Sequence, residues 1–199
     1  MTKLGKKAEA VYFLSIYILF MALDIVYKHS LADSFKYVFI VSCFLYSLKN
    51  IKKCRFVSVA LFCTCICDYF LLFTQKFSVG IFVFCVVMCI YIYGFTKNKY
   101  LPILLFAIYG VAAYIINPSD FPPVAIAYAL LFYSNLFICL KKYIRKNIII
   151  PAAFILFALC DIFVASYNIT GNEIYMPFMW LFYAPSQYII AHFFQRDVT

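Results

Sequence analysis

Charged residues are scarce in this chain. Only 13% of its 199 residues are Asp, Glu, Lys or Arg, whereas 67% are hydrophobic. A soluble domain is about a quarter charged and about half apolar. The apolar residues also form long runs without any charge. No water-soluble fold can bury that much apolar surface, so the surrounding solvent must be lipid.

Histidine and glycine are also rare, and their scarcity excludes several kinds of catalytic site. The two histidines, His29 and His192, are expected on opposite sides of the membrane, which excludes a zinc hydrolase built on clustered histidines. There are only five glycines, no phosphate-binding glycine loop and no G-x-S-x-G nucleophile elbow. We therefore expect neither a metal nor a cofactor.

The nine cysteines lie mostly inside apolar runs. Cys63, Cys65 and Cys67 are two positions apart, so on a helix they point to different sides and cannot converge on one metal ion. Free cysteine behaves as a small apolar residue. We expect these residues to pack in the bundle, and the pattern does not indicate a disulfide framework.

Eight apolar segments are candidates to cross the bilayer as helices, which takes about 20 residues each. The segments cover residues 9–27, 34–48, 56–74, 77–95, 100–116, 122–140, 148–167 and 174–194. Pro122 and Pro123 suit a first helical turn, and turns are expected at residues 117–120 and at Gly171 and Asn172. The first segment is too long for a signal peptide, and we expect it to be retained. The sequence thus predicts one all-α domain, a polytopic membrane helical bundle of about eight helices.

Basic residues are divided unevenly between the two faces of this predicted topology. They occur in short clusters between apolar segments, so the net charge of +9 does not indicate nucleic-acid binding. One face would carry 14 of the 17, namely Lys3, Lys6, Lys7, Lys49, Lys52, Lys53, Arg55, Lys97, Lys99, Lys141, Lys142, Arg145, Lys146 and Arg196. The other would carry only Lys28, Lys36 and Lys76. Because basic loops stay in the cytoplasm, we predict that both termini are cytoplasmic.

Two short motifs suggest an internal duplication. Cys67-Asp68-Tyr69-Phe70 and Cys160-Asp161-Ile162-Phe163 are 93 residues apart, close to half the chain. The offset equals four segments, so both helices would run in the same direction. Two parallel four-helix repeats would explain this and would place the two aspartates at equal depth. Coincidence explains so short a similarity equally well.

Asp68 and Asp161 are the only aspartates well inside predicted segments, while Asp24 is nearer the end of the first. An ionisable residue inside a membrane costs about 2.5–3.5 kcal/mol on insertion scales and marks a functional site. Two carboxyl groups that share a site can act as one acid and one base, which hydrolysis requires. The alternative is that each aspartate is protonated, or bonded to a neighbouring helix, and only stabilises the bundle.

Other polar residues fit the same site. Tyr183 and Gln187 are four apart and share a face of the last segment, and Pro185 between them should loosen that helix. Further candidates to line the site are Tyr91, Tyr128, Ser134 and Asn135. With 18 tyrosines in the chain, ordinary packing is the alternative for each tyrosine.

The order of these motifs resembles that of the YhhN family, the lysoplasmalogenases, over nearly the whole chain. The matching residues are Lys36; Asp68-Tyr69-Phe70-Leu71-Leu72 for G-D-x-x-L-L; Phe77, Gly80, Phe84 and Tyr91 for F-x-x-G-(x)-F…H-x-x-Y; Cys160-Asp161 for S-D; and Tyr183 with Gln187 for Y-x-x-x-Q. Three residues depart from the family pattern: Tyr37 replaces a proline, Cys67 a glycine and Met88 a histidine.

The resemblance implies hydrolysis of the vinyl ether bond of lysoplasmalogens to a fatty aldehyde and glycerophospho-ethanolamine or -choline. Asp68 and Asp161 would be the catalytic pair. Lys36, Tyr183 and Gln187 would position the headgroup or water. The substrate-binding set would be completed by Tyr91, Tyr128 and Asn135. The partners implied are a lysophospholipid and the lipid bilayer, in a bacterial inner membrane.

Two other classes of function fit the same pattern. One is a non-enzymatic lipid-binding or transport protein, in which the aspartates would relay protons or bind a cation. The other is an intramembrane aspartyl protease, which also uses two aspartates on two helices. The G-x-G-D motif of those proteases is absent, because Ile66 and Cys67 precede Asp68. Release of aldehyde from a lysoplasmalogen would separate the hydrolase from both.

Overall fold

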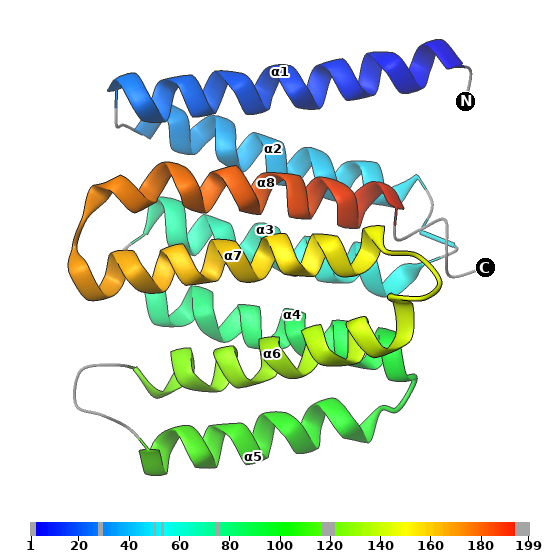
Figure 1. The fold of residues 1–199 in the computed structure, drawn as a ribbon, viewed down its shortest axis with the longest axis vertical. Helices are drawn as coiled ribbons and strands as arrows, with labels where there is room; N and C mark the ends of the chain where they lie inside the picture. The colour runs from blue at the N-terminus through cyan, green and yellow to red at the C-terminus, as the bar shows by residue number, and fades with distance from the viewer. Residues whose placement is uncertain are drawn as a thin grey trace.

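A computed structural model describes residues 3–27, 30–49, 51–52, 54–74, 76–116 and 122–193. Over these residues the chain forms eight α-helices and one short 3-10 helix (Figure 1). The elements are α1 (Lys3–Tyr27), α2 (Ser30–Leu48), α3 (Arg55–Phe73), α4 (Phe77–Thr96), α5 (Tyr100–Ile116), α6 (Pro123–Tyr143), α7 (Ile149–Thr170), η1 (Glu173–Tyr175) and α8 (Met176–Phe193).

The helices coincide with the predicted apolar segments to within a few residues. The largest differences are at the starts of α1 and α2, which begin six and four residues earlier than predicted. Polar residues such as Lys7 and Asp33 occupy these extra turns, because a helix can continue beyond the apolar stretch that lipid requires. The turn predicted at residues 117–120, His29 and Phe194 lie outside the described residues.

Local sequence explains where several helices begin and end. Pro123 is the first residue of α6, where its missing N–H costs no hydrogen bond. Gly171 has a φ of 65° and ends α7, which confirms the predicted turn there. Lys97 ends α4 in the same left-handed conformation, and its N–H bonds the carbonyl of Tyr93 at 2.8 Å.

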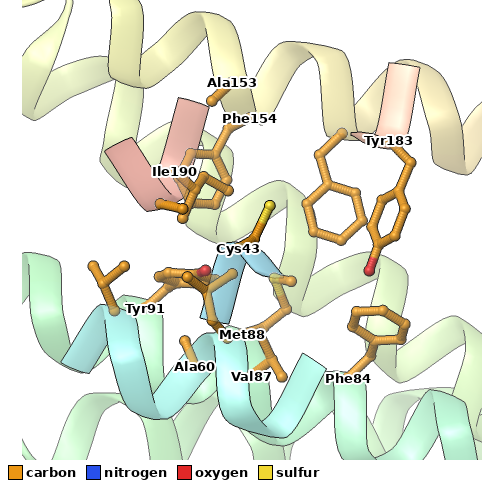
Figure 2. Packing of buried hydrophobic residues seen from close by; sticks show 14 of the residues in the cluster. Cys43, Ala60, Phe84, Val87, Met88, Tyr91, Ala153, Phe154, Tyr183 and Ile190 are labelled. Atoms are coloured by element: carbon orange, nitrogen blue, oxygen red, sulfur yellow. The ribbon is translucent and has the colours of Figure 1, made fainter. Parts of the chain in front are cut away.

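The helices lie side by side, with α1 and α5 at opposite edges (Figure 1). α8 contacts α1, α2, α3 and α7, whereas α5 contacts only α4 and α6 among the described elements. The interior is packed with aliphatic and aromatic side chains from most of the helices (Figure 2). α8 therefore sits where residues of both halves of the chain meet.

Close packing at Gly94 draws α3 and α4 together. A Cβ atom placed on Gly94 would lie 2.2 Å from Cδ2 of Phe56. At Gly80 the nearest atom would be Cδ2 of Leu71, at 2.8 Å. Gly94 thus leaves room that the Phe56 ring fills, and any larger residue would require the ring or the helices to shift.

Six of the described helices, or portions of them, are long and apolar enough to cross a membrane. They are α1, α2, α3, α4, α6 and α7, while α5 is apolar but has only 17 residues. Large apolar side chains such as Val11, Leu14 and Ile18 on α1 point outward. This all-helical architecture is compatible with a membrane helical bundle.

The two ends of the bundle differ in charge. α1 begins and α8 ends at one end, which we call the basic end (Figure 1). The basic residues in the described connections and helix termini there include Lys3, Lys6, Lys7, Lys49, Lys52, Arg55, Lys97, Lys99, Lys141, Lys142, Arg145 and Lys146. The opposite end contains a cavity, and we call it the cavity end. It has Lys36 and Lys76 among the described basic residues.

Candidate active site

Asp68 lies on α3 and is 3% exposed. The Tyr183 hydroxyl on α8 donates a hydrogen bond to its Oδ2 atom at 2.8 Å. Tyr183 is itself buried, and its hydroxyl points into the core from the α8 side (Figure 2). The carboxyl group of Asp68 is thus oriented by a residue 115 positions away in the chain.

Asp161 on α7 has an equivalent partner. The Tyr128 hydroxyl on α6 donates to its Oδ2 atom, also at 2.8 Å. Asp161 and Tyr128 are half-buried, in contrast to the fully enclosed Asp68 and Tyr183. In both pairs the tyrosine bonds Oδ2, so Oδ1 keeps its own capacity for hydrogen bonding.

A shared group of aromatic rings connects the two pairs. The Phe157 ring on α7 lies 5.3 Å from the Tyr183 ring and 6.0 Å from Phe84 on α4. The Phe84 ring in turn lies 5.8 Å from Tyr128. Tyr183 and Phe84 face each other across the core (Figure 2). The Asp68–Tyr183 and Asp161–Tyr128 pairs are therefore parts of one packed region that has apolar walls.

Lys36 belongs to a separate charged cluster at the cavity end. Its Nζ atom lies 2.7 Å from Asp24 Oδ1 and 3.0 Å from Asp33 Oδ1, and its side chain is 7% exposed. The ammonium also lies over the Trp180 ring, 5.3 Å from the centroid. Burial of the lysine is tolerated because two carboxylates and an aromatic face surround its charge.

This cluster lines a cavity of about 700 Å³ at the cavity end. Besides the charged groups, its walls are largely apolar. The lining residues are Asp24, Ile25, Asp33, Lys36, Leu71, Leu72, Tyr167, Glu173, Ile174, Met176, Pro177, Phe178, Met179 and Trp180. The volume is that of a site for a small molecule or for the polar part of a lipid.

The cavity approaches the first aspartate. Leu71 and Leu72 lie three and four residues beyond Asp68 on α3, about one helical turn or 5 Å along the axis. The Trp180 ring lies 5.2 Å from the Tyr183 ring, and Tyr183 bonds Asp68. Neither Asp68 nor Asp161 belongs to the lining set, so other side chains, Trp180 and Tyr183 among them, lie between this cavity and Asp68.

Three other predicted site residues, Tyr91, Asn135 and Gln187, are buried but are not hydrogen-bonded to either aspartate. The Tyr91 hydroxyl, Asn135 Oδ1 and Gln187 Oε1 have no hydrogen-bond partner among the described residues. Asn135 Nδ2 donates to Sδ of Met88 at 3.3 Å. Buried oxygens of this kind are suited to binding water or substrate hydroxyls.

Ser134, the remaining candidate, is not part of this region. A hydrogen bond of 2.6 Å joins its hydroxyl to the Tyr109 hydroxyl on α5, toward the edge of the bundle. No group of three or more His, Cys, Asp or Glu side chains that could hold a metal ion occurs among the described residues.

Four residues were not predicted from the sequence. Asp33, Glu173 and Trp180 line the cavity, and Phe157 belongs to the group of aromatic rings. Asp33 precedes Lys36 by three positions, a spacing that places both on one helix face and could have revealed the pair. Trp180 is the only tryptophan of the chain. Phe157 is one of 24 phenylalanines, and nothing in the sequence distinguishes it from the others.

Comparisons with models of known protein families, with curated proteins and with solved structures found no match to this chain.

Proposed function

We propose that this chain is a lysoplasmalogenase-like hydrolase of the YhhN type, which cleaves the vinyl ether bond of lysoplasmalogens. The observation that carries the proposal is the pair of aspartates within the helices, each bonded by a tyrosine hydroxyl at 2.8 Å. A carboxyl group inside a membrane bundle is costly, and two with matched partners favour acid–base chemistry. The motif order described above supports the same assignment.

The proposed reaction uses the two carboxyl groups in turn. One aspartic acid donates its proton to the vinyl carbon, and the resulting oxocarbenium ion is stabilised by the other, ionised aspartate. That aspartate takes a proton from water as the water oxygen bonds the cationic carbon. The hemiacetal then collapses: the first aspartate accepts the hemiacetal proton, the second protonates the departing glycerol oxygen, and both return to their starting states.

The cavity supplies a place for the polar part of the substrate. The phosphate on the third glycerol carbon would approach Lys36, whose ammonium has three N–H groups and two carboxylate partners. The vinyl ether on the first glycerol carbon would then reach inward toward Asp68. The apolar rings of Phe157 and Phe84 would keep water away from the hydrocarbon chain of the cationic intermediate.

The proposal includes the membrane arrangement. Eight spans, cytoplasmic basic loops and a cavity end that faces outward account for the uneven distribution of lysine and arginine. A bacterial inner membrane is the proposed location. A parallel four-helix duplication remains an interpretation that rests on the two Cys-Asp motifs, at Cys67–Asp68 and Cys160–Asp161.

The test is an aldehyde-release assay on purified protein with a lysoplasmalogen as substrate. We expect aldehyde to accumulate with turnover, and a lysophospholipid with an ester in place of the vinyl ether to yield none. The Asp68→Asn, Asp161→Asn double variant, purified in the same way, controls for contaminating hydrolases. Lipid binding without aldehyde release would refute the hydrolase and favour a lipid-binding or transport protein.

A further inference from the structure

Three lysines gather at the basic end, where α4 ends and where α6 passes into its connection to α7. We call Lys97, Lys142 and Lys146 the lysine cluster. The Lys142 ammonium donates a hydrogen bond to the backbone carbonyl of Phe95, two residues before Lys97. Lys97 and Lys146 both lie close enough to repel the Lys142 ammonium. All three lysines are exposed, so the cluster is an accessible concentration of positive charge built from two segments of the chain.

Carboxylates do not balance this charge in the part of the chain that the structure describes. The acidic residue found there at the basic end is Glu9 on α1, and it pairs with Lys49. The carbonyl groups at the end of α4 carry only a partial negative charge, and Lys142 already bonds one of them. A bound anion would offset the repulsion among the three ammonium groups, and phosphate is an anion that lysine commonly binds.

Lys97 occupies a position where the backbone favours a different residue. It ends α4 with a φ of 59°, and no other non-glycine residue among those described has a positive φ. Glycine or asparagine is usual at such a helix end, because a Cβ atom is disfavoured there. Lysine thus gives the backbone no advantage at this point. What it adds is its ammonium group, which is held over the Phe56 ring at 5.0 Å from the centroid.

Exposed apolar side chains beside the cluster favour a lipid over a soluble phosphate. Tyr93 precedes Lys97 by one helical turn and is 45% exposed, and Ile144 lies between Lys142 and Lys146 in the chain and is 50% exposed. α4 and α6 contact each other, and both are long and apolar enough to cross a membrane. Lysines at the ends of such helices lie at the level of the lipid headgroups. An acyl chain can follow the apolar helix surface while its phosphate contacts the cluster.

We propose that the lysine cluster binds the headgroup phosphate of an anionic phospholipid from the surrounding bilayer. The inference rests on the membrane helical bundle and is independent of the proposed hydrolysis. It also differs from the general tendency of basic loops to stay in the cytoplasm. A binding site requires that these particular lysines act together and that other lysines at the same end do not contribute.

The test compares the binding of phosphatidylglycerol and phosphatidylcholine, with identical acyl chains, to the purified protein in detergent by native mass spectrometry. Both lipids contain one phosphate, but only phosphatidylglycerol has a net negative charge. A lysine near an anionic lipid contributes about fivefold in affinity, so three lysines predict a preference on the order of a hundredfold. Glycerol phosphate at the same concentration should not displace the lipid, because it has no acyl chains.

Single variants identify the lysines responsible. Lys142→Gln and Lys146→Gln should each weaken phosphatidylglycerol binding about fivefold. Lys97→Gly should do the same and still fold, because glycine suits a φ of 59°. Lys52→Gln is the matched control, since Lys52 is exposed at the same end of the bundle but lies outside the cluster. That variant should keep the affinity of the parent protein, and thermal unfolding in lipid-free detergent checks that all four variants are folded.

Equal affinity for the two lipids or displacement by glycerol phosphate would overturn the site. A loss with Lys52→Gln as large as that of the cluster variants would overturn it too, and would show that the basic end attracts anions only through its overall charge. None of these variants changes Asp68 or Asp161, and the readout is lipid binding. Failure of the hydrolase in the aldehyde assay would therefore leave the lysine cluster standing, and failure of the cluster would leave the hydrolase standing.

Discussion

Each of the two central aspartates receives one hydrogen bond from a tyrosine hydroxyl. This arrangement fixes the plane of each carboxyl group while leaving one oxygen for proton exchange. A neutral isostere can distinguish a catalytic role from a structural one, because only a catalytic aspartate would lose its activity on replacement by asparagine.

We expect Asp68→Asn and Asp161→Asn each to reduce turnover of a lysoplasmalogen at least about a hundredfold, the usual scale for general acid–base catalysis. Asparagine keeps the shape and can still accept the tyrosine hydrogen bond, so the bundle should fold. The double variant should be little worse than either single one, because the two residues act as a unit. Near-full hydrolysis by both folded single variants would contradict the two-aspartate mechanism.

The tyrosines can be tested separately from the carboxyl groups. Tyr183→Phe and Tyr128→Phe remove one hydrogen bond each to a carboxyl group, and we expect turnover to fall about tenfold or more. Tyr109→Phe is the matched control, since its hydroxyl bonds Ser134 at the edge of the bundle. Equal rates for all three variants in the aldehyde assay would show that the tyrosines do not orient the catalytic groups.

A positioning role is also expected for Gln187, which lies one turn beyond Tyr183 on α8. Gln187→Ala should lower turnover less than either aspartate variant, because positioning is shared among several groups. Aldehyde release by the purified variant, measured beside Asp68→Asn, provides the comparison. A loss as large as that of Asp68→Asn would contradict shared positioning and would mean that Gln187 alone is essential for it.

The sequence named candidate polar residues but not their contacts. Asp68 and Asp161 stood out because ionisable residues are rare in apolar segments, whereas Lys36 was named from the resemblance to the YhhN family. Their hydrogen-bond partners could not be predicted, because a bond between residues 115 positions apart depends on how α3 and α8 rotate and pack. Tyr91 and Gln187 were predicted beside the substrate, yet neither lines the cavity, which is enclosed by a different layer of side chains.

At the scale of helices, the apolar runs were sufficient to predict the eight α-helices of the described residues, although not the short 3-10 helix η1. The pairing of the helices required the structure. Tyr128 comes from α6 and Tyr183 from α8, which are not equivalent helices in the proposed duplication. Positions 93 residues before them hold Phe35 and Ile90, which cannot donate such bonds. If the halves share an origin, the tyrosine partners are not part of what they share.

The close approach of α3 and α4 gives a stability prediction. Gly94→Ala would place a methyl group 2.2 Å from the Phe56 ring, and we expect a loss of about 1–3 kcal/mol, the usual cost of overpacking. Gly110→Ala on α5 is the control, because a Cβ atom there meets nothing within 4 Å. Thermal unfolding in detergent should show a lower midpoint for Gly94→Ala alone. Equal midpoints would mean that the Phe56 ring or the helices adjust to the methyl group without loss of stability.

At the scale of the whole molecule, we expect the basic end to determine how the protein is oriented in the membrane. Reporter fusions after Phe95 and after Thr199 should both be cytoplasmic, because lysine and arginine concentrate at that end of the bundle. A fusion after Phe73, at the other end of α3, is the control and should be external. An external signal from either of the first two fusions would contradict eight spans.

The cavity lies at the end of the bundle away from the basic connections, and this position has a consequence for the fate of the products. In the proposed orientation the site receives lipids only from the outer leaflet. Cleavage there would divide one molecule between two phases: the water-soluble glycerophosphodiester would leave on the external side, while the long-chain aldehyde would stay in the bilayer. The cell would lose the headgroup, and the reactive aldehyde would be left to enzymes that work within or at the membrane.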